Sequence, residues 1–174
     1  MSAQRIFGVT GWKNAGKTGL MERLVEEITA RGFSVSTLKH AHHDTDVDEP
    51  GRDSHRHRTA GARQVLLASP RRWALMTELR EAPEPDVEAL VARLDPVDLV
   101  LIEGWKRGPH PKIEAHRAET GKPPRAGVDP TIRALASDGA EAEGLPVFDL
   151  DATAAIADFV LGQVGLPLRA EGAA

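Results

Sequence analysis

The opening forty residues carry two kinds of apolar pattern. Residues 5–10 form a short apolar run rich in strand formers, and Val35 to Lys39 form another. Between them, residues 19–30 show helical spacing of their apolar side chains, at Leu20, Leu24, Val25 and Ile28. Gly32 follows this segment, as expected just beyond a helix end. The pattern predicts one β-α-β unit.

The same patterns return after a long polar stretch. Residues 87–94 predict an amphipathic helix, and the segment Asp98 to Gly104 contains the unbroken aliphatic run Leu99 to Ile102, which is typical of a parallel strand buried on both faces. Further strands are expected at residues 132–136 and 147–148. A last helix is expected with Asp151 as its cap and Gly165 beyond its end. Alternating strands and helices predict an α/β fold.

The most specific chemical signal lies between the first strand and the first helix. Residues 11–18 match the phosphate-binding pattern G-x-x-x-x-G-K-[ST], as Gly11, Trp12, Lys13, Asn14, Ala15, Gly16, Lys17 and Thr18. Inward-pointing N–H groups and the helix N-terminus bind phosphates in such a loop. Lys17 is expected on the β- and γ-phosphates and Thr18 on a Mg²⁺ ion. The sequence thus predicts a three-layer P-loop NTPase fold with a mainly parallel sheet and an inserted polar arm.

The aliphatic strand ends in Glu103 and Gly104, the form expected of a Walker B element. Parallel strands open at their carboxyl ends into the ligand crevice, so Glu103 should emerge beside the P-loop. Two roles are open there, holding Mg²⁺ through water or positioning the attacking water, and the metal-linked role is preferred. The plain alternative is an exposed acid at an ordinary strand end.

Length and composition narrow the class of protein. The 174 residues suit a single domain, expected over residues 1–168, with a disordered tail at 169–174. Cysteine is absent, which excludes disulfides and thiolate metal sites, and no apolar stretch suggests a signal peptide or a membrane helix. A net charge of −4 with 4% aromatics argues against nucleic-acid binding. A cytoplasmic protein with small-molecule or protein partners is expected.

Residues 39–72 form a polar segment between the predicted strands and helices, and this segment holds five of the seven histidines. Acidic residues come first and arginines follow, so an acidic patch should adjoin a basic one. The basic part is open to two interpretations, a phosphate-binding or acidic-partner surface and a solvated face. The histidines invite a zinc or nickel hypothesis, but His42 and His43 are adjacent and the others alternate with arginines. A structural or solvated role is favoured for them.

Several short motifs in a shared order resemble the molybdopterin-guanine dinucleotide biosynthesis protein B (MobB) family over roughly residues 5–160. Besides residues 11–18, they comprise Lys39 to Asp44, Pro50 to Ser54, Arg58 to Ala62, Pro70 to Glu78, Leu101 to Lys106 and Ala136 to Asp138. Each motif alone is weak, but their common order is specific.

The resemblance implies a small, commonly dimeric GTP-binding protein with slow GTPase activity. Its implied partner is the molybdenum cofactor guanylyltransferase, the nucleotidyltransferase that joins GMP to molybdopterin, for which it would serve as an adapter. Molybdopterin itself is a further candidate ligand. The arm at residues 41–63 would build a dimer and ligand-facing surface, with Asp53 near the γ-phosphate. No Asn-Lys-x-Asp guanine motif occurs, and Asp138, after the predicted strand 132–136, is the candidate acceptor for the base.

Two other functions stay open. A small-molecule P-loop kinase would need a lid, for which residues 105–130 are a candidate because they contain Arg107, Lys112, Arg117, Lys122 and Arg125. A nickel-delivery GTPase is suggested by the histidines and disfavoured by the missing cysteines. Hydrolysis would also need charge neutralisation on the leaving diphosphate, and the sequence shows no arginine that reaches it.

Overall fold

The structure is a computed structural model that describes residues 4–41 and 48–172. It forms two compact units. Residues 1–40 and 87–174 make up the first, here named the P-loop unit, and residues 41–86 make up the second, the hairpin unit. The described residues contain no helix long and apolar enough to cross a membrane.

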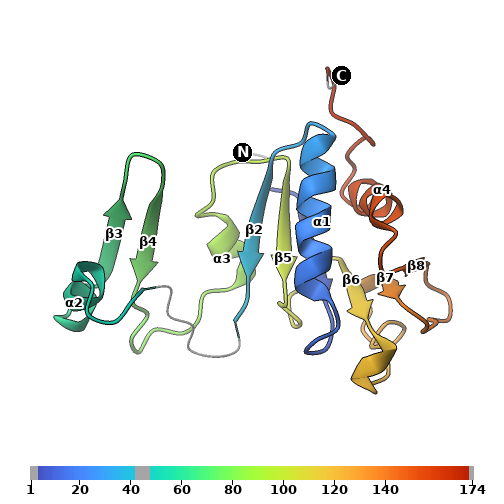
Figure 1. Cartoon of the computed structure of the whole chain (residues 1–174), viewed down its shortest axis with the longest axis horizontal. Coiled ribbons are helices and arrows are strands. Elements are labelled where there is room, and N and C mark those ends of the chain that lie inside the picture. The colour runs from blue at the N-terminus through green and yellow to red at the C-terminus, as the bar shows by residue number, and fades with distance from the viewer. Residues whose placement is uncertain (1–3, 42–47, 173–174) are drawn as a thin grey trace. The chain divides into compact units, whose positions relative to one another are not determined.

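A six-stranded parallel sheet forms the centre of the P-loop unit (Figure 1). Its strand order is β2-β5-β1-β6-β7-β8. The strands are β1 (Ile6–Thr10), β2 (Val35–Lys39), β5 (Leu99–Glu103), β6 (Lys112–His116), β7 (Ile132–Ser137) and β8 (Val147–Asp149). The predicted P-loop NTPase fold with its mainly parallel sheet is thereby confirmed. Every carboxyl end faces the same edge, the lower one in Figure 1.

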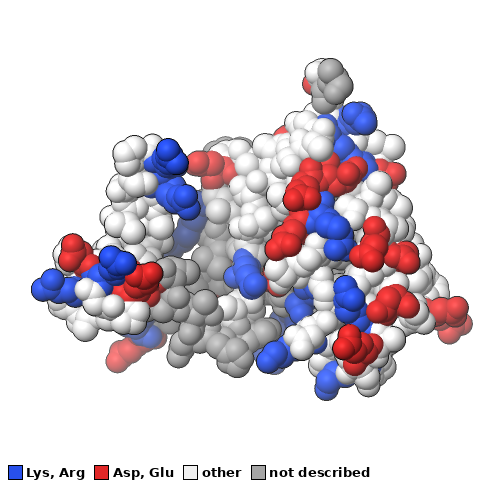
Figure 2. All heavy atoms as spheres, in the orientation of Figure 1, with Lys and Arg blue, Asp and Glu red and all other residues white. Residues whose placement is uncertain are grey.

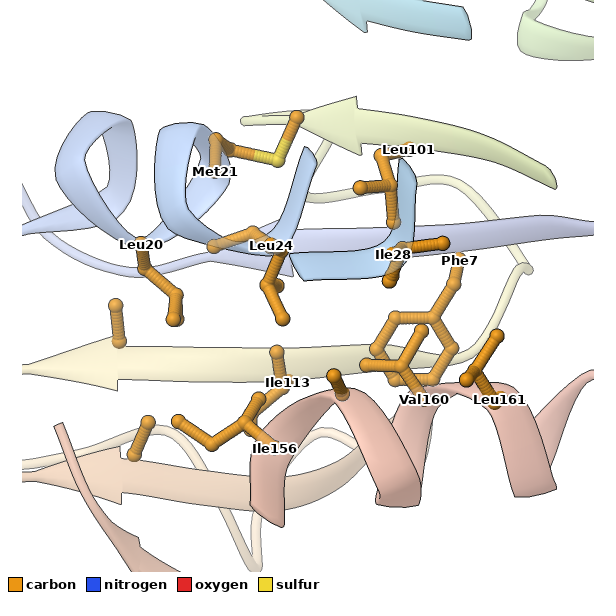
Figure 3. Close-up of a cluster of buried hydrophobic side chains, with 14 of the residues drawn as sticks. Phe7, Leu20, Met21, Leu24, Ile28, Leu101, Ile113, Ile156, Val160 and Leu161 are labelled. Atoms are coloured by element: carbon orange, nitrogen blue, oxygen red, sulfur yellow. The ribbon is translucent and has the colours of Figure 1, made fainter. Parts of the chain in front are cut away.

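Helices and loops cover both faces of this sheet. On one face, α1 (Lys17–Ala30) and α4 (Thr153–Gln163) pack their apolar sides on β1 and β6 in one continuous cluster (Figure 3). Leu20, Leu24 and Ile28 of α1 are fully buried there, at the helical spacing that the sequence shows. The opposite face carries two smaller clusters, one with α3 (Val87–Val91) and one around Ile132. The core fixes the strand ends that carry the candidate site.

The start of the last helix differs from the expectation. The helix begins after Ala152 and has no side-chain cap, because Asp151 lies one residue too early and its carboxylate faces Arg23 at 3.3 Å. Near the end of the chain, Ala170 donates its N–H to the carbonyl of Arg31, the C-cap of α1, at 3.0 Å, and the disordered tail at 169–174 stays a prediction. Residues 173 and 174 lie outside the described part.

Residues 105–130, the candidate kinase lid, contain a strand that the sequence analysis missed. Strand β6 lies next to β1 in the middle of the sheet, and all five of its residues are buried. The lid interpretation is therefore wrong for this part, since Lys112 lies in the sheet interior. Its Nζ donates to the carbonyls of Gly108 and His110 at 2.5 and 2.9 Å and to Thr131 Oγ1 at 2.9 Å.

The hairpin unit consists of α2 (Asp53–Thr59) and the antiparallel pair β3 (Gln64–Ala68) and β4 (Trp73–Thr77). In the register of this pair, Leu66 lies opposite Leu75 and Ala68 opposite Trp73, so their side chains share one face. Leu66, Trp73 and Leu75 are 59%, 65% and 45% exposed. This apolar stripe on β3 and β4, named here the hairpin stripe, was not expected from the sequence.

Candidate phosphate-binding site

The P-loop curls between β1 and α1, and three of its residues take left-handed backbone conformations. Gly11 has φ 141° and lies so close to β6 that a Cβ there would overlap the Ala115 carbonyl oxygen. Gly16 has φ 91° at the N-cap of α1, and Asn14 has φ 64°. Glycine and asparagine are the residues that tolerate such backbones best. The motif's glycines are thus required by geometry as well as by chemistry.

Residues 14–19 enclose a hollow of about 280 Å³ at the N-terminus of α1. The first N–H groups of a helix have no partner within the helix, and they create positive potential at this end. No acidic side chain lies in the first turn of α1 to offset that potential. The hollow therefore suits an anion such as a phosphate group.

Lys17 reaches back over the loop, and its Nζ donates to the Trp12 carbonyl at 2.6 Å. Burial lowers the pKa of the Lys17 ammonium, an effect that the Glu103 carboxylate opposes and that Lys106 and Lys39 reinforce. Additional negative charge in the hollow would favour the charged form of Lys17. The side chain is thus placed to move from the carbonyl to a phosphate oxygen.

Glu103 and Thr18 come together as the sequence predicts. Thr18 Oγ1 donates to Glu103 Oε1 at 3.0 Å, and Lys39 Nζ lies 3.7 Å from the same oxygen. Glu103 is only 9% exposed, so it is not the exposed acid of the plain alternative. A hydroxyl and a carboxylate at hydrogen-bond distance supply the hard oxygen ligands, direct or through water, that Mg²⁺ prefers. The pair fits a magnesium ion beside the P-loop.

A second hollow of about 470 Å³ adjoins this pair on the side of β2. Thr18 and Glu103 form one end of it, and apolar side chains such as Met21, Val25 and Leu38 form much of its wall. The candidate magnesium position thus has open space next to it for an additional group.

Trp12 connects the P-loop to the segment that follows β6. Its indole Nε1 donates to the Pro123 carbonyl at 2.9 Å, and Lys122 Nζ lies 4.9 Å from the ring centroid. Lys106 Nζ lies 5.5 Å from the same ring. Figure 2 shows Lys and Arg side chains, with Asp and Glu side chains among them, along the lower edge of the P-loop unit, where its strands end. Lys106 and Lys122 therefore place positive charge beside Trp12 of the phosphate-binding loop.

Buried polar residues of β6 hold that segment in place. Glu114 Oε2 accepts the N–H groups of Arg125 and Ala126, both at 2.7 Å, and His116 Nε2 lies 2.8 Å from the Lys122 carbonyl. Burial raises the pKa of the Glu114 carboxyl, although the two amide hydrogen bonds oppose the rise. The segment over Trp12 is thus anchored from within the sheet.

His110 precedes β6 and is buried without polar partners. Neither of its ring nitrogens has a hydrogen-bond partner among the described residues, and the ring packs against Gly8 and Gly108. Burial and the neighbouring Lys112 charge lower the pKa of His110 to about 4. The imidazole is consequently neutral near pH 7.

Asp138 lies directly after β7, at the same edge of the sheet as the P-loop. It is exposed, and its Oδ1 accepts the Ala118 N–H at 2.8 Å. Its second carboxylate oxygen leaves an acceptor for a ligand. Its assignment to the guanine base stays a prediction.

The remaining candidate residues of the sequence analysis belong to the hairpin unit or fall outside the described part of the chain. Asp53 is at the start of α2 in the hairpin unit, where Arg56 Nη1 lies 3.8 Å from it, and its place near the γ-phosphate stays a prediction. His42 and His43 lie outside the described residues. Within the described part of the chain, no three His, Asp or Glu side chains are grouped to hold a metal ion.

Sequence reasoning missed the contribution of Arg117 and Leu150 to the site. A Cβ placed on Gly16 would lie 3.1 Å from Arg117 Nε and 3.3 Å from Leu150 Cδ2, so both residues border the P-loop. They follow β6 and β8, and a correct prediction of β6 from the alternation in Lys112 to His116 would have placed Arg117 at the site edge.

The chain is similar in sequence to known proteins over most of its length. A sequence model of the family described as molybdopterin guanine dinucleotide synthesis protein B matches residues 6–138. The molybdopterin-guanine dinucleotide biosynthesis adapter protein of Escherichia coli (strain K12) is 38% identical over 159 residues, covering 90% of this chain and 91% of the relative. The protein of that name from Haemophilus influenzae is 40% identical over 158 residues, covering 89% and 86%.

The solved structures show the same fold. The crystal structure of Bacillus subtilis MobB superposes with a TM-score of 0.71 at 27% identity, covering 92% of this chain and 98% of that one. Fold, motif order and sequence identity thus coincide over most of the chain, and the protein belongs to the molybdopterin guanine dinucleotide synthesis protein B (MobB) family.

Proposed function

We propose that this protein is a GTP-binding adapter in molybdopterin-guanine dinucleotide biosynthesis. It binds GTP with Mg²⁺ in the P-loop, hydrolyses it slowly, and assists the nucleotidyltransferase that attaches GMP to molybdopterin. The adapter role is that of the relatives from E. coli and H. influenzae, by their names. We place the protein in the cytoplasm with this pathway.

The observation that carries the nucleotide part is the pairing of Thr18 with Glu103 beside the phosphate-sized hollow. Thr18 Oγ1 and Glu103 Oε1 are 3.0 Å apart, and the Lys17 ammonium lies in the same loop with its pKa lowered by burial. A phosphate group in the hollow and Mg²⁺ on this pair would be neighbours, as in P-loop NTPases. Slow turnover is consistent with the absence of any arginine at this pair among the described contacts.

A dimer is the second part of the proposal, and the hairpin stripe supports it. Leu66, Trp73 and Leu75 form a contiguous apolar surface on a two-stranded sheet. Exposed apolar patches of this kind mark interaction sites. The surface lies just after the arm at residues 41–63, where the family resemblance places the interface, and a second copy of the chain is the proposed occupant.

The test is a competition titration of GTP against ATP with Mg²⁺, read by displacement of a fluorescent nucleotide. GTP should displace it at a lower concentration than ATP. Lys17→Ala should weaken GTP binding by at least about 100-fold, because the charge on the β- and γ-phosphates is lost. Arg133→Ala, an exposed charge removal at the opposite end of β7, serves as the control.

The outcomes separate the hypotheses. Unchanged affinity in folded Lys17→Ala would remove the P-loop assignment. A preference for ATP would favour the small-molecule kinase, for which the hollow of about 470 Å³ beside Thr18 and Glu103 offers space for an acceptor.

A further inference from the structure

Arg117 lies beside the P-loop and directly precedes a residue that contacts Asp138. Its side chain borders Gly16, where a Cβ would lie 3.1 Å from Nε and 3.7 Å from Nη2. The next residue, Ala118, donates its N–H to Asp138 Oδ1 at 2.8 Å. Arg117 thus contacts the phosphate-binding loop, while Ala118 contacts Asp138, the predicted acceptor for the base.

The backbone of Arg117 is fixed on both sides. It directly follows the last residue of β6, His116, and is the N-cap of the short 3-10 helix Ala118–Thr120. Its carbonyl accepts hydrogen bonds from Thr120 N at 3.0 Å and from Thr120 Oγ1 at 2.8 Å. Since the backbone is held, the side chain leaves it from a constant position beside Gly16.

The guanidinium of Arg117 has no polar partner among the described residues. Among the described residues it makes no hydrogen bond and no ion pair, and it is half-buried. Arg23 and Arg31 of the same unit differ, because each is bound by a carboxylate, from Asp151 and Asp158 respectively. A half-buried guanidinium without an acid keeps its planar face and its five donors available for a ligand.

We infer that Arg117 stacks its guanidinium plane on the base of the bound nucleotide, an inference that rests on the proposed nucleotide-binding function. A nucleotide runs from phosphates through ribose to base. With the phosphates in the P-loop and the base at Asp138, a group between them faces the ribose and the base. Guanidinium planes stack readily on aromatic rings, because they are planar, charged and weakly hydrated.

In this arrangement, stacking on the base by Arg117 and recognition of the base edge by Asp138 are separate contributions to binding. Every purine presents a ring face, so Arg117 strengthens GTP and ATP binding by the same factor. Asp138 can discriminate, because guanine offers N–H donors on the edge where adenine has a different pattern. Arg117 therefore contributes affinity, and Asp138 contributes the preference for guanine.

The experiment titrates the full chain and its variants with GTP, ATP and inorganic tripolyphosphate in the presence of Mg²⁺. Arg117→Ala should weaken GTP and ATP binding alike by about 5–30-fold. Tripolyphosphate affinity should stay within about twofold, because that probe has no base. Arg117→Lys should lose less than Arg117→Ala, and Arg133→Ala, the exposed control, should match the parent.

Each other outcome overturns the inference. Equal losses for GTP and tripolyphosphate would make Arg117 a phosphate ligand instead, and parent-like GTP binding by folded Arg117→Ala would remove it from the site. If Arg117→Ala fails to fold, the same three titrations are made with Arg117→Gln and Arg117→Lys, and the losses of nucleotide and tripolyphosphate affinity are compared between these two variants. Failure of the parent to bind any nucleotide would refute the proposed function itself, which is a distinct result.

Discussion

The two units bury their apolar side chains to different extents. In the P-loop unit, eighteen buried residues form one cluster between the sheet and helices α1 and α4. In the described part of the hairpin unit, Val65 is the only buried hydrophobic side chain, while Leu66, Trp73 and Leu75 are exposed. The first unit is closed around its own core, and the second presents apolar surface outward.

The two units must therefore be stabilised by different interactions. A two-stranded hairpin is marginally stable in water by itself, and a large exposed apolar patch is rare on a monomer. Within the hairpin unit, Arg58 joins Asp48 and Glu78 at 3.2 and 2.7 Å, so polar contacts hold α2 to the hairpin. The P-loop unit is thus stabilised by its own apolar core, whereas the hairpin unit relies on ion pairs and leaves apolar side chains exposed.

The largest difference in the free energy of unfolding should come from a Leu→Ala substitution made once in each unit. Leu24→Ala removes a fully buried side chain from the core, and it should cost about 2–5 kcal/mol of unfolding free energy. Leu66→Ala should cost less than about 0.5 kcal/mol in the monomer, because the side chain is already exposed. Urea unfolding at concentrations where light scattering shows a monomer measures both. Similar losses would contradict the comparison.

Acid should destabilise the P-loop unit through His110. Its pKa is about 4 in the folded protein against an ordinary 6.5, so the unfolded state takes up the proton first as pH falls. This contribution to stability is complete above pH 6.5 and is lost as pH falls toward 4. At roughly 1.4 kcal/mol per unit, the loss is about 3 kcal/mol.

Unfolding experiments at several pH values measure this slope. His110→Gln should flatten it relative to the parent between pH 6.5 and 4. His57→Gln, an exposed substitution on α2 of the hairpin unit, should leave the slope as it is. An unchanged slope in His110→Gln would show that other groups cause the acid sensitivity.

Association should depend on the hairpin stripe and not on the surface of the P-loop unit. Leu66→Ser combined with Leu75→Ser should raise the dimer dissociation constant at least tenfold, or about 1.4–2 kcal/mol, because two facing apolar anchors are lost. Sedimentation velocity measures the shift, and Leu168→Ser, which changes an exposed leucine of the P-loop unit, is the matched control. A parent-like dimer in the double variant would exclude the stripe as its interface.

The smallest effect concerns the chemistry inside the P-loop unit. Glu103→Gln keeps the shape of the side chain and removes its charge, so hydrolysis should slow about tenfold, or about 1.4 kcal/mol, with GTP affinity within about threefold. Phosphate release at saturating GTP gives the rate. Glu88→Gln on α3 changes an exposed acid and should behave like the parent. Equal rates in all three proteins would remove Glu103 from the hydrolytic step.

Much of the P-loop unit could be predicted because its signals are local. The spacing of Leu20, Leu24 and Ile28, the aliphatic run at 99–102 and the motif at 11–18 each identify an element without reference to the rest of the chain. The meeting of Thr18 and Glu103 followed from one rule, that parallel strands end at a common edge. Local pattern and this rule were sufficient for that part of the site.

The missed elements depend on tertiary contacts. Strand β6 buries Lys112, Glu114 and His116, which read as a polar loop until groups 6 to 19 residues further along the chain satisfy them, such as the Lys122 carbonyl and Thr131 Oγ1. The hairpin strands were hidden within an arginine-rich segment, because their leucines face outward and form no core signal. The place of Arg117 beside the P-loop was missed with β6, since this position depends on the end of that strand.

The three tryptophans give this protein a set of optical reporters. Trp12 lies in the P-loop, Trp105 lies against His40 with ring centroids 4.4 Å apart, and Trp73 lies on the hairpin stripe. Each indole therefore senses a different part of the molecule, namely the phosphate loop, the end of β5 and the stripe. In variants that keep one tryptophan at a time, the emission wavelength and quenching of that indole would distinguish ligand binding from association.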